Sequence, residues 1–417
     1  MEKSRRRKKS AIEEDKPTRD KFLPYGLHWI DEDDIQEVVK VLKSDWITQG
    51  PKIREFEKAL AKFTGAKYAV ALSSGTAALH AACFAAGIAE GDEVITTPIT
   101  FVASSNCVLY MGGRPVFADI EEDTYNIDPD EIQKKITNRT KAIIPVDFAG
   151  HPVDLDKVCK IAKSHNLVVI EDAAHALGAE YKGKKIGSIS DMTIFSFHPV
   201  KHITTGEGGV VTTNNEEYYE KLLMFRTHGI TRNFSKFANK RLSFAFNFQL
   251  SASHANPWYY EMQELGYNYR ITDFQAALGL SQLRKLNKFI SRRRGIVKNY
   301  NQSFQKVEEI IIPYEKPGVK SSWHIYVIRM KLNKLRATRR EIFEALRKEE
   351  IGVNVHYIPV YYHSYYKKLG YKEGLCPKAE RYYEEAITLP LFPKMSDGDV
   401  KKVIISVKKV IKSLKGN

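Results

Sequence analysis

The feature that most constrains the fold is the alternation, between residues 93 and 213, of short apolar runs with stretches of helical periodicity. The apolar runs are EVITT (93–97), PVFADI (115–120), AIIPVDF (142–148), LVVIED (167–172), MTIFSF (192–197) and GVVTT (209–213). Helices are predicted near 129–136, 154–165 and 216–225. Apolar strands separated by helices are typical of a mostly parallel sheet covered on both faces. The sequence therefore predicts an α/β fold class, with functional side chains beyond the carboxyl ends of the strands.

The chain of 417 residues is longer than one hydrophobic core usually supports, so we expect two structural parts. The first 20 residues have no apolar core and are predicted to be a disordered basic tail. Residues 21–260 are predicted to form a large domain, and residues 261–417 a linking helix and a smaller C-terminal α+β domain. Further helices are expected near 31–43, 53–63, from about Thr76, near 272–289, 338–349 and 377–386, and at the C-terminus, with strands at 325–332 and 353–358.

Composition excludes several classes of protein. No apolar stretch approaches the roughly 20 residues of a membrane span, and the N-terminus does not resemble a secretory signal. The four cysteines show no paired spacing, which predicts buried thiols and a cytoplasmic location. Metal-binding spacings such as HExxH are absent, so no metal is expected. The net charge of +15 is compatible with a soluble surface, with nucleic-acid binding or with an anionic substrate.

One acidic and one basic residue stand at the ends of two predicted strands. Asp172 closes LVVIED, and Lys201 follows MTIFSF just before a glycine cluster. A lysine amine that can form a Schiff base and a carboxylate that holds a ring nitrogen protonated are what pyridoxal 5′-phosphate (PLP) needs. His175 could then hydrogen-bond the phenolic oxygen of the cofactor. Taken singly, Asp172 could equally cap a turn, and His175 could be a buried histidine bonded to the backbone.

Three further positions suit the same cofactor. Gly75 and Thr76 begin a predicted helix, whose free N–H groups and dipole favour a phosphate. Ser196, on the strand that leads to Lys201, could add a hydroxyl to that phosphate. Phe101 could stack on the pyridine ring. Each of these residues also has an ordinary structural interpretation: a helix start, a strand serine and a core phenylalanine.

Five segments in this order resemble the DegT-type sugar-nucleotide aminotransferases, which belong to the fold-type I PLP enzymes: SSGTAALH, TPITFVASSN, EDAAHALG, SFHPVKHITTGEGG and GYNYRITDFQAALG. The resemblance runs from about Phe22 to the final helix. It implies a seven-stranded, mostly parallel sheet and the cofactor roles given above for Lys201, Asp172 and His175. It also implies a homodimer with shared active sites, in which Asn268 reaches the phosphate of the neighbouring subunit.

Other segments, among them LKSDWITQGP and VHYIPVYYH, resemble members of the family that act on the route to pseudaminic acid. The resemblance implies transfer of an amino group from L-glutamate to C4 of a UDP-linked 4-keto-6-deoxy-N-acetylhexosamine. Residues that match motifs facing the sugar nucleotide are Tyr25, Gln49, His356 and Tyr357. The segment 226–260 is basic and contains no acidic residue, so we expect Arg226 or Arg241 to contact the diphosphate.

Three alternative functions were weighed against the sequence. The keto sugar could carry dTDP or GDP in place of UDP. Some relatives are sugar 3-dehydratases that have a histidine where this chain has Lys201, and this lysine argues against that activity. Some DegT-type proteins are described as regulators, but the sequence has no helix-turn-helix, zinc-ligand or RNA-binding pattern. We therefore expect neither nucleic acid nor membrane among the partners.

Overall fold

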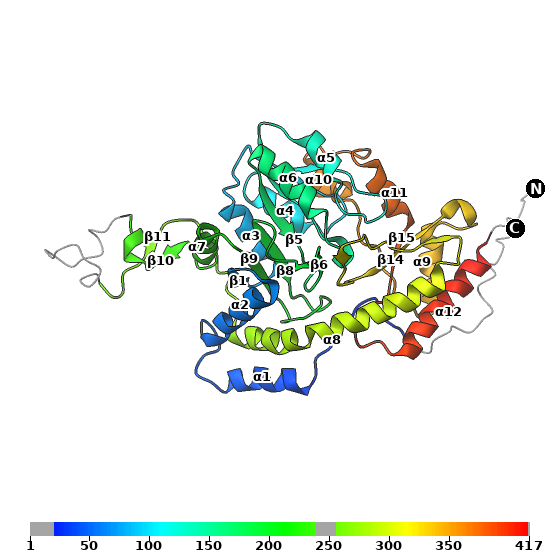
Figure 1. The fold of residues 1–417 in the computed structure, drawn as a ribbon, viewed down its shortest axis with the longest axis horizontal. Coiled ribbons are helices and arrows are strands. Elements are labelled where there is room, and N and C mark those ends of the chain that lie inside the picture. Colours follow the sequence, from blue (N-terminus) through cyan, green and yellow to red (C-terminus); the bar gives the residue numbers. More distant parts are fainter. Residues whose placement is uncertain (1–20, 239–255, 416–417) are drawn as a thin grey trace, which may run out of the picture.

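The computed structural model describes residues 21–238 and 256–415. Its centre is a seven-stranded sheet in the order β1-β9-β8-β5-β4-β2-β3 (Figure 1). The strands are β1 (Tyr68–Leu72), β2 (Glu93–Thr96), β3 (Arg114–Phe117), β4 (Thr140–Ile144), β5 (Val168–Asp172), β8 (Met192–Ser196) and β9 (Gly209–Thr213). Only β9 runs antiparallel to its neighbours, β1 and β8. The predicted α/β class with a mostly parallel seven-stranded sheet is confirmed.

The direction of β9 follows from its connection. A loop of residues 197–208 joins β8 to β9 without a crossover helix, so the chain turns back beside β8. A parallel neighbour needs a longer crossover connection. Lys201 lies on this loop, at the edge of the sheet where the parallel strands β4, β5 and β8 also end. The loop therefore brings a lysine to the predicted functional edge.

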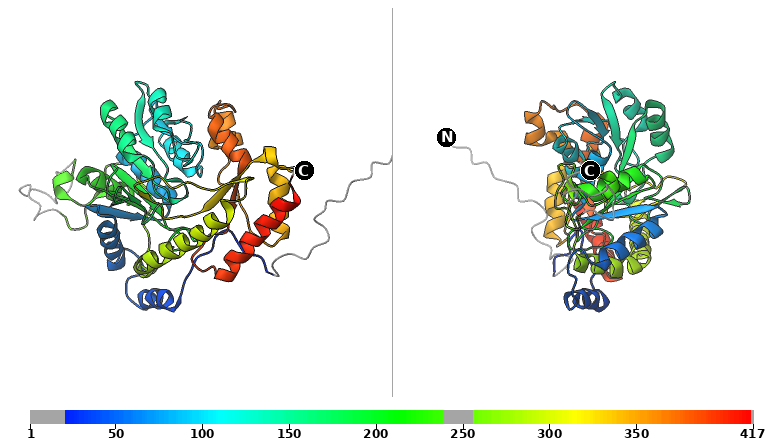
Figure 2. Two further views of the ribbon diagram at one scale, coloured as in Figure 1. Left: turned by 45° about the vertical axis from the view of Figure 1, so that its right-hand side comes forward. Right: turned by 90° about the vertical axis from the view of Figure 1, so that its left-hand side faces the viewer.

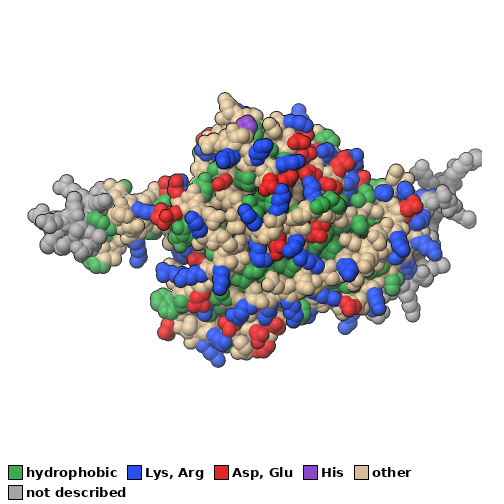
Figure 3. Space-filling view, viewed as in Figure 1, with side chains coloured by type: hydrophobic (Ala, Val, Ile, Leu, Met, Phe, Trp, Pro, Cys, Tyr) green, Lys and Arg blue, Asp and Glu red, His purple; other side chains and the backbone are tan. Residues whose placement is uncertain are grey.

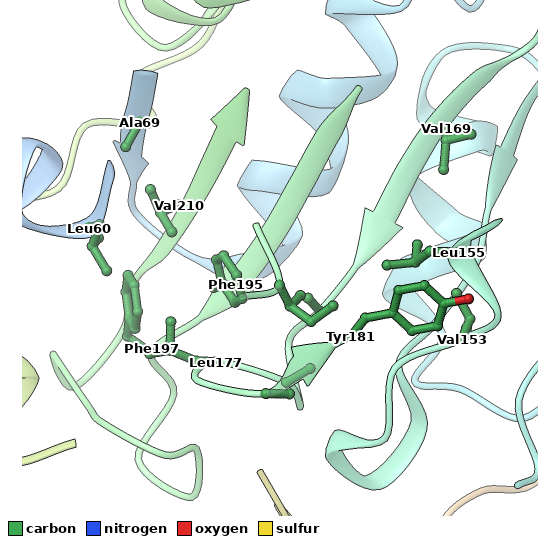
Figure 4. Packing of buried hydrophobic residues seen from close by; sticks show 14 of the residues in the cluster. Leu60, Ala69, Val153, Leu155, Val169, Leu177, Tyr181, Phe195, Phe197 and Val210 are labelled. Carbon is green, nitrogen blue, oxygen red and sulfur yellow. The ribbon is translucent and has the colours of Figure 1, made fainter. Parts of the chain in front are cut away.

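Helices cover both faces of the sheet, as the sequence predicts. One face packs against α3 (Gly75–Ala85), α4 (Ala103–Tyr110) and α7 (Glu216–Phe225), and the other against α2 (Pro51–Thr64), α5 (Pro129–Lys135) and α6 (Leu155–His165). Figure 4 shows the second face, where Leu60 of α2 lies near Val210 and Leu155 of α6 lies near Val169 and Tyr181. In β1, Val70 and Leu72 belong to one core and Ala69 and Ala71 to the other, because successive side chains point to opposite faces.

A second unit follows the long helix α8 (Asp273–Phe304). Its sheet has the order β12-β14-β15, formed by Ile310–Ile311, Tyr326–Met330 and Ala386–Leu389. The helices of this unit are α9 (Arg339–Lys348), α10 (Ser364–Lys368), α11 (Pro377–Glu385) and α12 (Asp397–Ser413). In Figure 2, α12 lies alongside α8. Leu23 joins the core of this unit and bridges Ile351, so the N-terminal end of the described chain packs with its C-terminal part.

The structure differs from the sequence-based expectation in several elements. Residues 353–358 do not form a strand: Asn354 makes an isolated bridge to Thr388, and β15 takes the third place in the small sheet. The alternation of apolar and polar residues at 353–358 resembles a half-buried strand, whereas β15 is buried throughout and shows no alternation. Helix α8 extends to Phe304, well beyond the predicted end at 289. Strand β1 was not expected from the sequence.

Smaller elements complete the described chain. Helix α1 (Glu32–Leu42) lies against α8, where Gln282 donates to Asp34. A small antiparallel sheet has the order β13-β6-β7, formed by Val319–Lys320, Glu180–Tyr181 and Lys184–Lys185. The hairpin of β10 (Ile230–Thr231) and β11 (Glu261–Met262) projects from the body at the left of Figure 1.

The remaining features concern membrane-spanning helices and the distribution of charged side chains. In the described ranges, no helix has the length and apolar character needed to cross a membrane. Lysine and arginine side chains are scattered among acidic ones over the face in Figure 3 and do not gather into one patch there. The division of the chain at residue 260 and the tail at 1–20 stay predictions, and the tail lies outside the described residues.

Candidate active site

A cavity of about 650 Å³ opens at the carboxyl ends of β5 and β8. It brings together most of the residues that the sequence singles out: Tyr25, Gly75, Thr76, Phe101, Asp172, His175, Ser196, Lys201, His356 and Tyr357. These side chains come from the segment before α1, the N-terminus of α3, the loop after β2, the end of β5 and the turn after it, the end of β8, the β8–β9 loop and the segment before α10. The cavity therefore collects residues more than 300 positions apart around Lys201.

Lys201 lies in the β8–β9 loop, where its backbone N–H donates to the carbonyl of His198 at 2.9 Å. Burial of the amine lowers the pKa of Lys201 to about 8, and the negative charge of Asp172 opposes this shift. Desolvation disfavours the ammonium form, so a fraction of the amine is uncharged near neutral pH. An uncharged amine is the form that can attack an aldehyde or accept a proton.

Asp172 ends β5 and is almost completely buried. Its Oδ2 accepts a hydrogen bond from the Ser104 hydroxyl at 2.6 Å, and its Oδ1 accepts one from the backbone N–H of Ala174 at 3.1 Å. Burial raises the pKa of Asp172, whereas these two donors and the charge of Lys201 lower it. Asp172 and Lys201 thus face one cavity as a carboxylate and an amine that influence each other.

His175 follows Asp172 in the next turn and is also buried. Its Nε2 lies 3.1 Å from the Tyr357 hydroxyl, and its Nδ1 has no hydrogen-bond partner among the described residues. Burial and the nearby charge of Lys201 lower the pKa of His175 well below its usual value. His356 lies beside Tyr357, and its Nδ1 is 2.8 Å from the Thr388 hydroxyl. The imidazole of His175 is therefore a neutral, polar part of the cavity wall.

The first turn of α3 also lines the cavity. Ser74 caps this helix by accepting a hydrogen bond from the Ala77 N–H at 3.1 Å, and Gly75 and Thr76 line the cavity. A Cβ at Gly75 would lie 3.0 Å from the Cβ of Ser196, so only glycine leaves these two residues in close contact without a shift. Phe101 is 61% exposed and lines the same cavity. The N-terminus of α3 is thus open to an anion.

Four predicted site residues lie elsewhere. Gln49 and Arg226 line a second cavity of about 620 Å³. Arg226 donates to Glu57 at 2.6 Å and to the carbonyl of Ala71 at 2.8 Å, so the structure does not bring it to the cavity of Lys201. Asn268 is exposed and makes an isolated bridge to Thr227. Arg241 falls outside the described residues.

Sequence reasoning missed several residues of the main cavity. Ser104 donates directly to Asp172, and Thr100, Asn354 and His363 also line the cavity. Ser104 and Thr100 lie within TPITFVASSN, a segment from which only Phe101 was assigned a role. A hydroxyl four residues after another, at the start of a helix near the predicted site, is the signal that could have found them.

These residues fit PLP. The cavity has a buried amine with a lowered pKa, a buried carboxylate and the open N-terminus of an eleven-residue helix. Lys201 would hold the aldehyde carbon, Asp172 the ring nitrogen, and Gly75, Thr76 and Ser196 the phosphate. Within residues 21–238 and 256–415, no group of three or more His, Cys, Asp or Glu side chains is arranged to hold a metal ion.

Comparison with known proteins gives consistent results. The model of the DegT/DnrJ/EryC1/StrS aminotransferase family matches residues 28–408. An uncharacterised protein of Methanocaldococcus jannaschii is 48% identical over 94% of this chain and 98% of its own length. The spore coat polysaccharide biosynthesis protein SpsC of Bacillus subtilis is 45% identical, also over 94% and 98%. A UDP-4-amino-4,6-dideoxy-N-acetyl-β-L-altrosamine transaminase of Campylobacter jejuni is 39% identical over 94% and 99%.

Solved structures with the same fold include other proteins described as aminotransferases. Helicobacter pylori PseC, an aminotransferase of pseudaminic acid biosynthesis, has a TM-score of 0.85 and 35% identity over 94% of this chain and all of its own. The PLP form of Spr1654, a putative sugar aminotransferase of Streptococcus pneumoniae, has a TM-score of 0.84 and 35% identity over the same shares.

Proposed function

Because the chain belongs to the DegT/DnrJ/EryC1/StrS aminotransferase family and is a PLP-dependent sugar aminotransferase, we propose that it aminates C4 of a UDP-linked 4-keto-6-deoxy-N-acetylhexosamine. The amino donor in this proposal is L-glutamate, and the product enters pseudaminic acid biosynthesis. The Campylobacter transaminase and Helicobacter PseC support this substrate, at 39% and 35% identity. SpsC supports the more general assignment to polysaccharide precursors.

The single observation that carries the proposal is the position of Lys201 and Asp172 on one cavity. PLP, when bound, supplies an aldehyde that takes up the amino group and a ring that withdraws electrons from the reacting carbon. Asp172 would pair with the protonated ring nitrogen of the bound cofactor. The amine of Lys201, with a pKa of about 8, is suited to take a proton from one carbon of the substrate and return it to another.

The other cavity residues position the reactants. In our proposal, the N–H groups at the start of α3 and the Ser196 hydroxyl bind the phosphate, and Phe101 covers the ring. His175, whose Nε2 lies 3.1 Å from the Tyr357 hydroxyl, would hydrogen-bond the phenolic oxygen of the bound cofactor. Tyr25, His356 and Tyr357 face the sugar because they line the part of the cavity formed by the N- and C-terminal segments.

Some contacts require a second copy of the chain. Asn268 is exposed and does not line its own cavity, which is consistent with a contact to the phosphate of a neighbouring subunit. We propose a homodimer with shared active sites on this basis.

The contact of Gln49 with the sugar nucleotide and the contact of Arg226 or Arg241 with the diphosphate stay predictions. A cytoplasmic location also stays a prediction. The four cysteines, from which that location was predicted, are free thiols in the structure, and Cys159 is only half-buried.

A substrate panel tests the proposed activity. The protein with PLP is incubated with L-glutamate and with UDP- and dTDP-linked 4-ketohexoses, and aminated products are identified by mass spectrometry and NMR. We expect amination at C4 of the UDP-linked N-acetylhexosamine and release of 2-oxoglutarate. The Lys201→Ala variant is the blank. Amination of the dTDP-linked sugar alone would contradict the proposed substrate and support the alternative nucleotide, while no amination of any keto sugar would contradict the function.

Two measurements test the proposed contacts. Light scattering should give twice the mass of the 47.6 kDa chain, and a monomer that is fully active would rule out shared sites. Titration of UDP against Arg226→Ala and Arg241→Ala tests the diphosphate contact, and unchanged affinity in both variants would refute it. Because Arg226 also pairs with Glu57, Glu57→Gln serves as the control for the loss of that ion pair.

A further inference from the structure

Asp172 lies in a place where burial works against ionisation of its carboxyl. The side chain is 5% exposed, and burial raises the pKa of its carboxyl. A buried carboxylate persists only when donors satisfy its oxygens. Ser104 is the strongest of the groups that favour the ionised form, ahead of the Ala174 N–H and the charge of Lys201.

The hydrogen bond from Ser104 has a defined direction. The Ser104 hydroxyl lies 2.6 Å from Asp172 Oδ2, 2.7 Å from the Thr100 hydroxyl and 3.3 Å from the carbonyl of Phe101. An ionised carboxylate can only accept, so Ser104 must donate its single proton to Asp172. Thr100 must then donate to Ser104. Thr100 and Ser104 are buried, at 4% and 1% exposure.

We propose that Thr100 and Ser104 form a hydroxyl relay, Thr100→Ser104→Asp172, which holds Asp172 as the oriented carboxylate that pairs with the ring nitrogen of PLP. Both are positioning residues, because they act through Asp172. The proposal rests on the role proposed above for Asp172. It assigns a use to two residues of TPITFVASSN that lie on the cavity wall beside Phe101.

The charged and titratable groups around Asp172 come from five places. Glu171 precedes it on β5, Asp147 follows β4, Cys107 lies on α4, Lys201 lies on the β8–β9 loop, and Tyr357 lies in the segment before α10. All of them remain in the variants below. Differences between these variants and the wild type therefore report on the Asp172 carboxyl and its donors.

The first test uses the cofactor-free protein, so no activity enters the result. The free energy of unfolding of Ser104→Ala is compared with that of the wild type at pH 5 and pH 8. Losing the donor raises the pKa of Asp172 further. A carboxyl whose folded pKa is raised loses its contribution to stability as the pH rises through that pKa.

Relative to the wild type, we expect Ser104→Ala to lower the ratio of folded to unfolded protein about tenfold more at pH 8 than at pH 5. A packing defect would cost the same at both values, and such a result would overturn the proposal. Ser105→Ala is the matched control, because this serine is the next residue of α4 and is equally buried.

The second test is a fluorescence titration of PLP into the same proteins. Ser104→Ala should bind PLP about ten- to a hundredfold more weakly, because a hydrogen bond to a charged group is lost. Thr100→Val should show a smaller loss, Thr100→Ser should restore binding, and Ser105→Ala should bind like the wild type. Unchanged affinity in Ser104→Ala would overturn the relay.

The variant Asp172→Asn separates the relay from the function on which it rests. If it binds PLP as tightly as the wild type, the role of Asp172 is refuted together with the relay. If Asp172→Asn weakens PLP binding and Ser104→Ala does not, only the relay is refuted. Weaker binding in both supports the relay.

Discussion

At the scale of single residues, the environment of each ionisable group sets its protonation state. Lys201 and Asp172 belong to residue types that are usually charged and exposed. Here burial lowers the pKa of the first and raises the pKa of the second, and each partly opposes the shift of the other. Opposite shifts in neighbouring groups are typical of active sites.

The first prediction concerns the amine of Lys201. Lys201→Ala should abolish turnover and the visible absorbance that PLP gains on attachment to this lysine, since no other amine lines the cavity in the described part of the chain. Spectrophotometry and the amination assay measure the two effects. Lys163→Ala, at an exposed position of α6, should leave both unchanged. Persistent turnover in Lys201→Ala would refute the mechanism.

The second prediction concerns the pH dependence of PLP capture by the cofactor-free protein. Because burial lowers the pKa of Lys201 to about 8, the capture rate should rise with pH to a midpoint near 8. Asp172→Asn should lower this midpoint, since the negative charge of Asp172 favours the ammonium form. Stopped-flow absorbance at a series of pH values measures the rate. A midpoint near 10.5, the ordinary lysine value, would contradict the prediction.

The third prediction concerns two carboxyls behind Asp172. Glu171 Oε2 accepts from Ser190 at 3.0 Å and Thr193 at 2.8 Å, and Asp147 Oδ1 accepts from Val153 at 2.9 Å. Their other oxygens have no partner among the described residues. Burial and mutual repulsion raise the pKa of Asp147, and burial raises that of Glu171. We interpret the pair as sharing one proton.

Glu171→Gln removes one of the two carboxyls and its repulsion of Asp147, so the pair no longer shares a proton and the pKa of Asp147 rises less. Because the folded pKa values are raised, the stability that the pair contributes is present at low pH and lost as the pH rises through those values. The variant should therefore gain at least about 1 kcal/mol relative to the wild type between pH 5 and pH 8, since one pKa unit is worth about 1.4 kcal/mol. Urea unfolding measures the difference, and exposed Glu90→Gln is the control. A difference that does not depend on pH would contradict the interpretation.

At the scale of elements, the connections between strands and helices place the site. Parallel strands end at one edge of the sheet, and the loops and helix starts that follow β2, β5 and β8 meet there. Helix α3 follows β1, which pairs with β9, and its N-terminus adds free N–H groups. The sheet topology explains why these elements meet at one edge, whereas Tyr25, His356 and Tyr357 reach the cavity from segments outside the large sheet.

The fourth prediction compares two glycines of α8. A Cβ at Gly279 would meet the Phe56 ring at 2.6 Å, whereas a Cβ at Gly295 would meet nothing within 4 Å. Gly279→Ala should lower the free energy of unfolding by about 1–3 kcal/mol through overpacking. Gly295→Ala should raise it by about 0.5–1 kcal/mol, because alanine favours the helix. Chemical denaturation measures both, and changes of the same sign would contradict this account of α8.

At the scale of the whole molecule, α8 joins the two parts of the chain. Leu286, Phe289 and Ile290 belong to the core of the large sheet, and Ile296, Val297 and Tyr300 belong to the core of the small sheet. Arg293 lies between these groups and is 1% exposed. Its guanidinium donates to the carbonyls of His324 at 2.9 Å, Leu391 at 2.8 Å and Trp323 at 3.3 Å.

The fifth prediction follows from this junction. Arg293→Ala leaves three buried carbonyls without their donor and opens a cavity, so the free energy of unfolding should fall by on the order of 3–5 kcal/mol. Because the two cores meet at this side chain, loss of activity should accompany the loss of stability. Lys298→Ala, at an exposed position five residues further along α8, should change stability little. Wild-type stability in Arg293→Ala would show that the junction does not depend on this residue.

The sequence by itself determined the α/β class, most strand and helix positions, and the two residues at the centre of the site. These properties depend on neighbouring residues, because continuous apolar runs, turn residues and a lysine before glycines can be recognised directly in the sequence. The tertiary structure alone decided which residues meet. Residues 354–358 line the cavity and join the small sheet only through the bridge of Asn354 to Thr388. Ser104 reaches Asp172, and Arg226 pairs with Glu57. Such contacts join distant segments, and their geometry depends on how the whole chain packs.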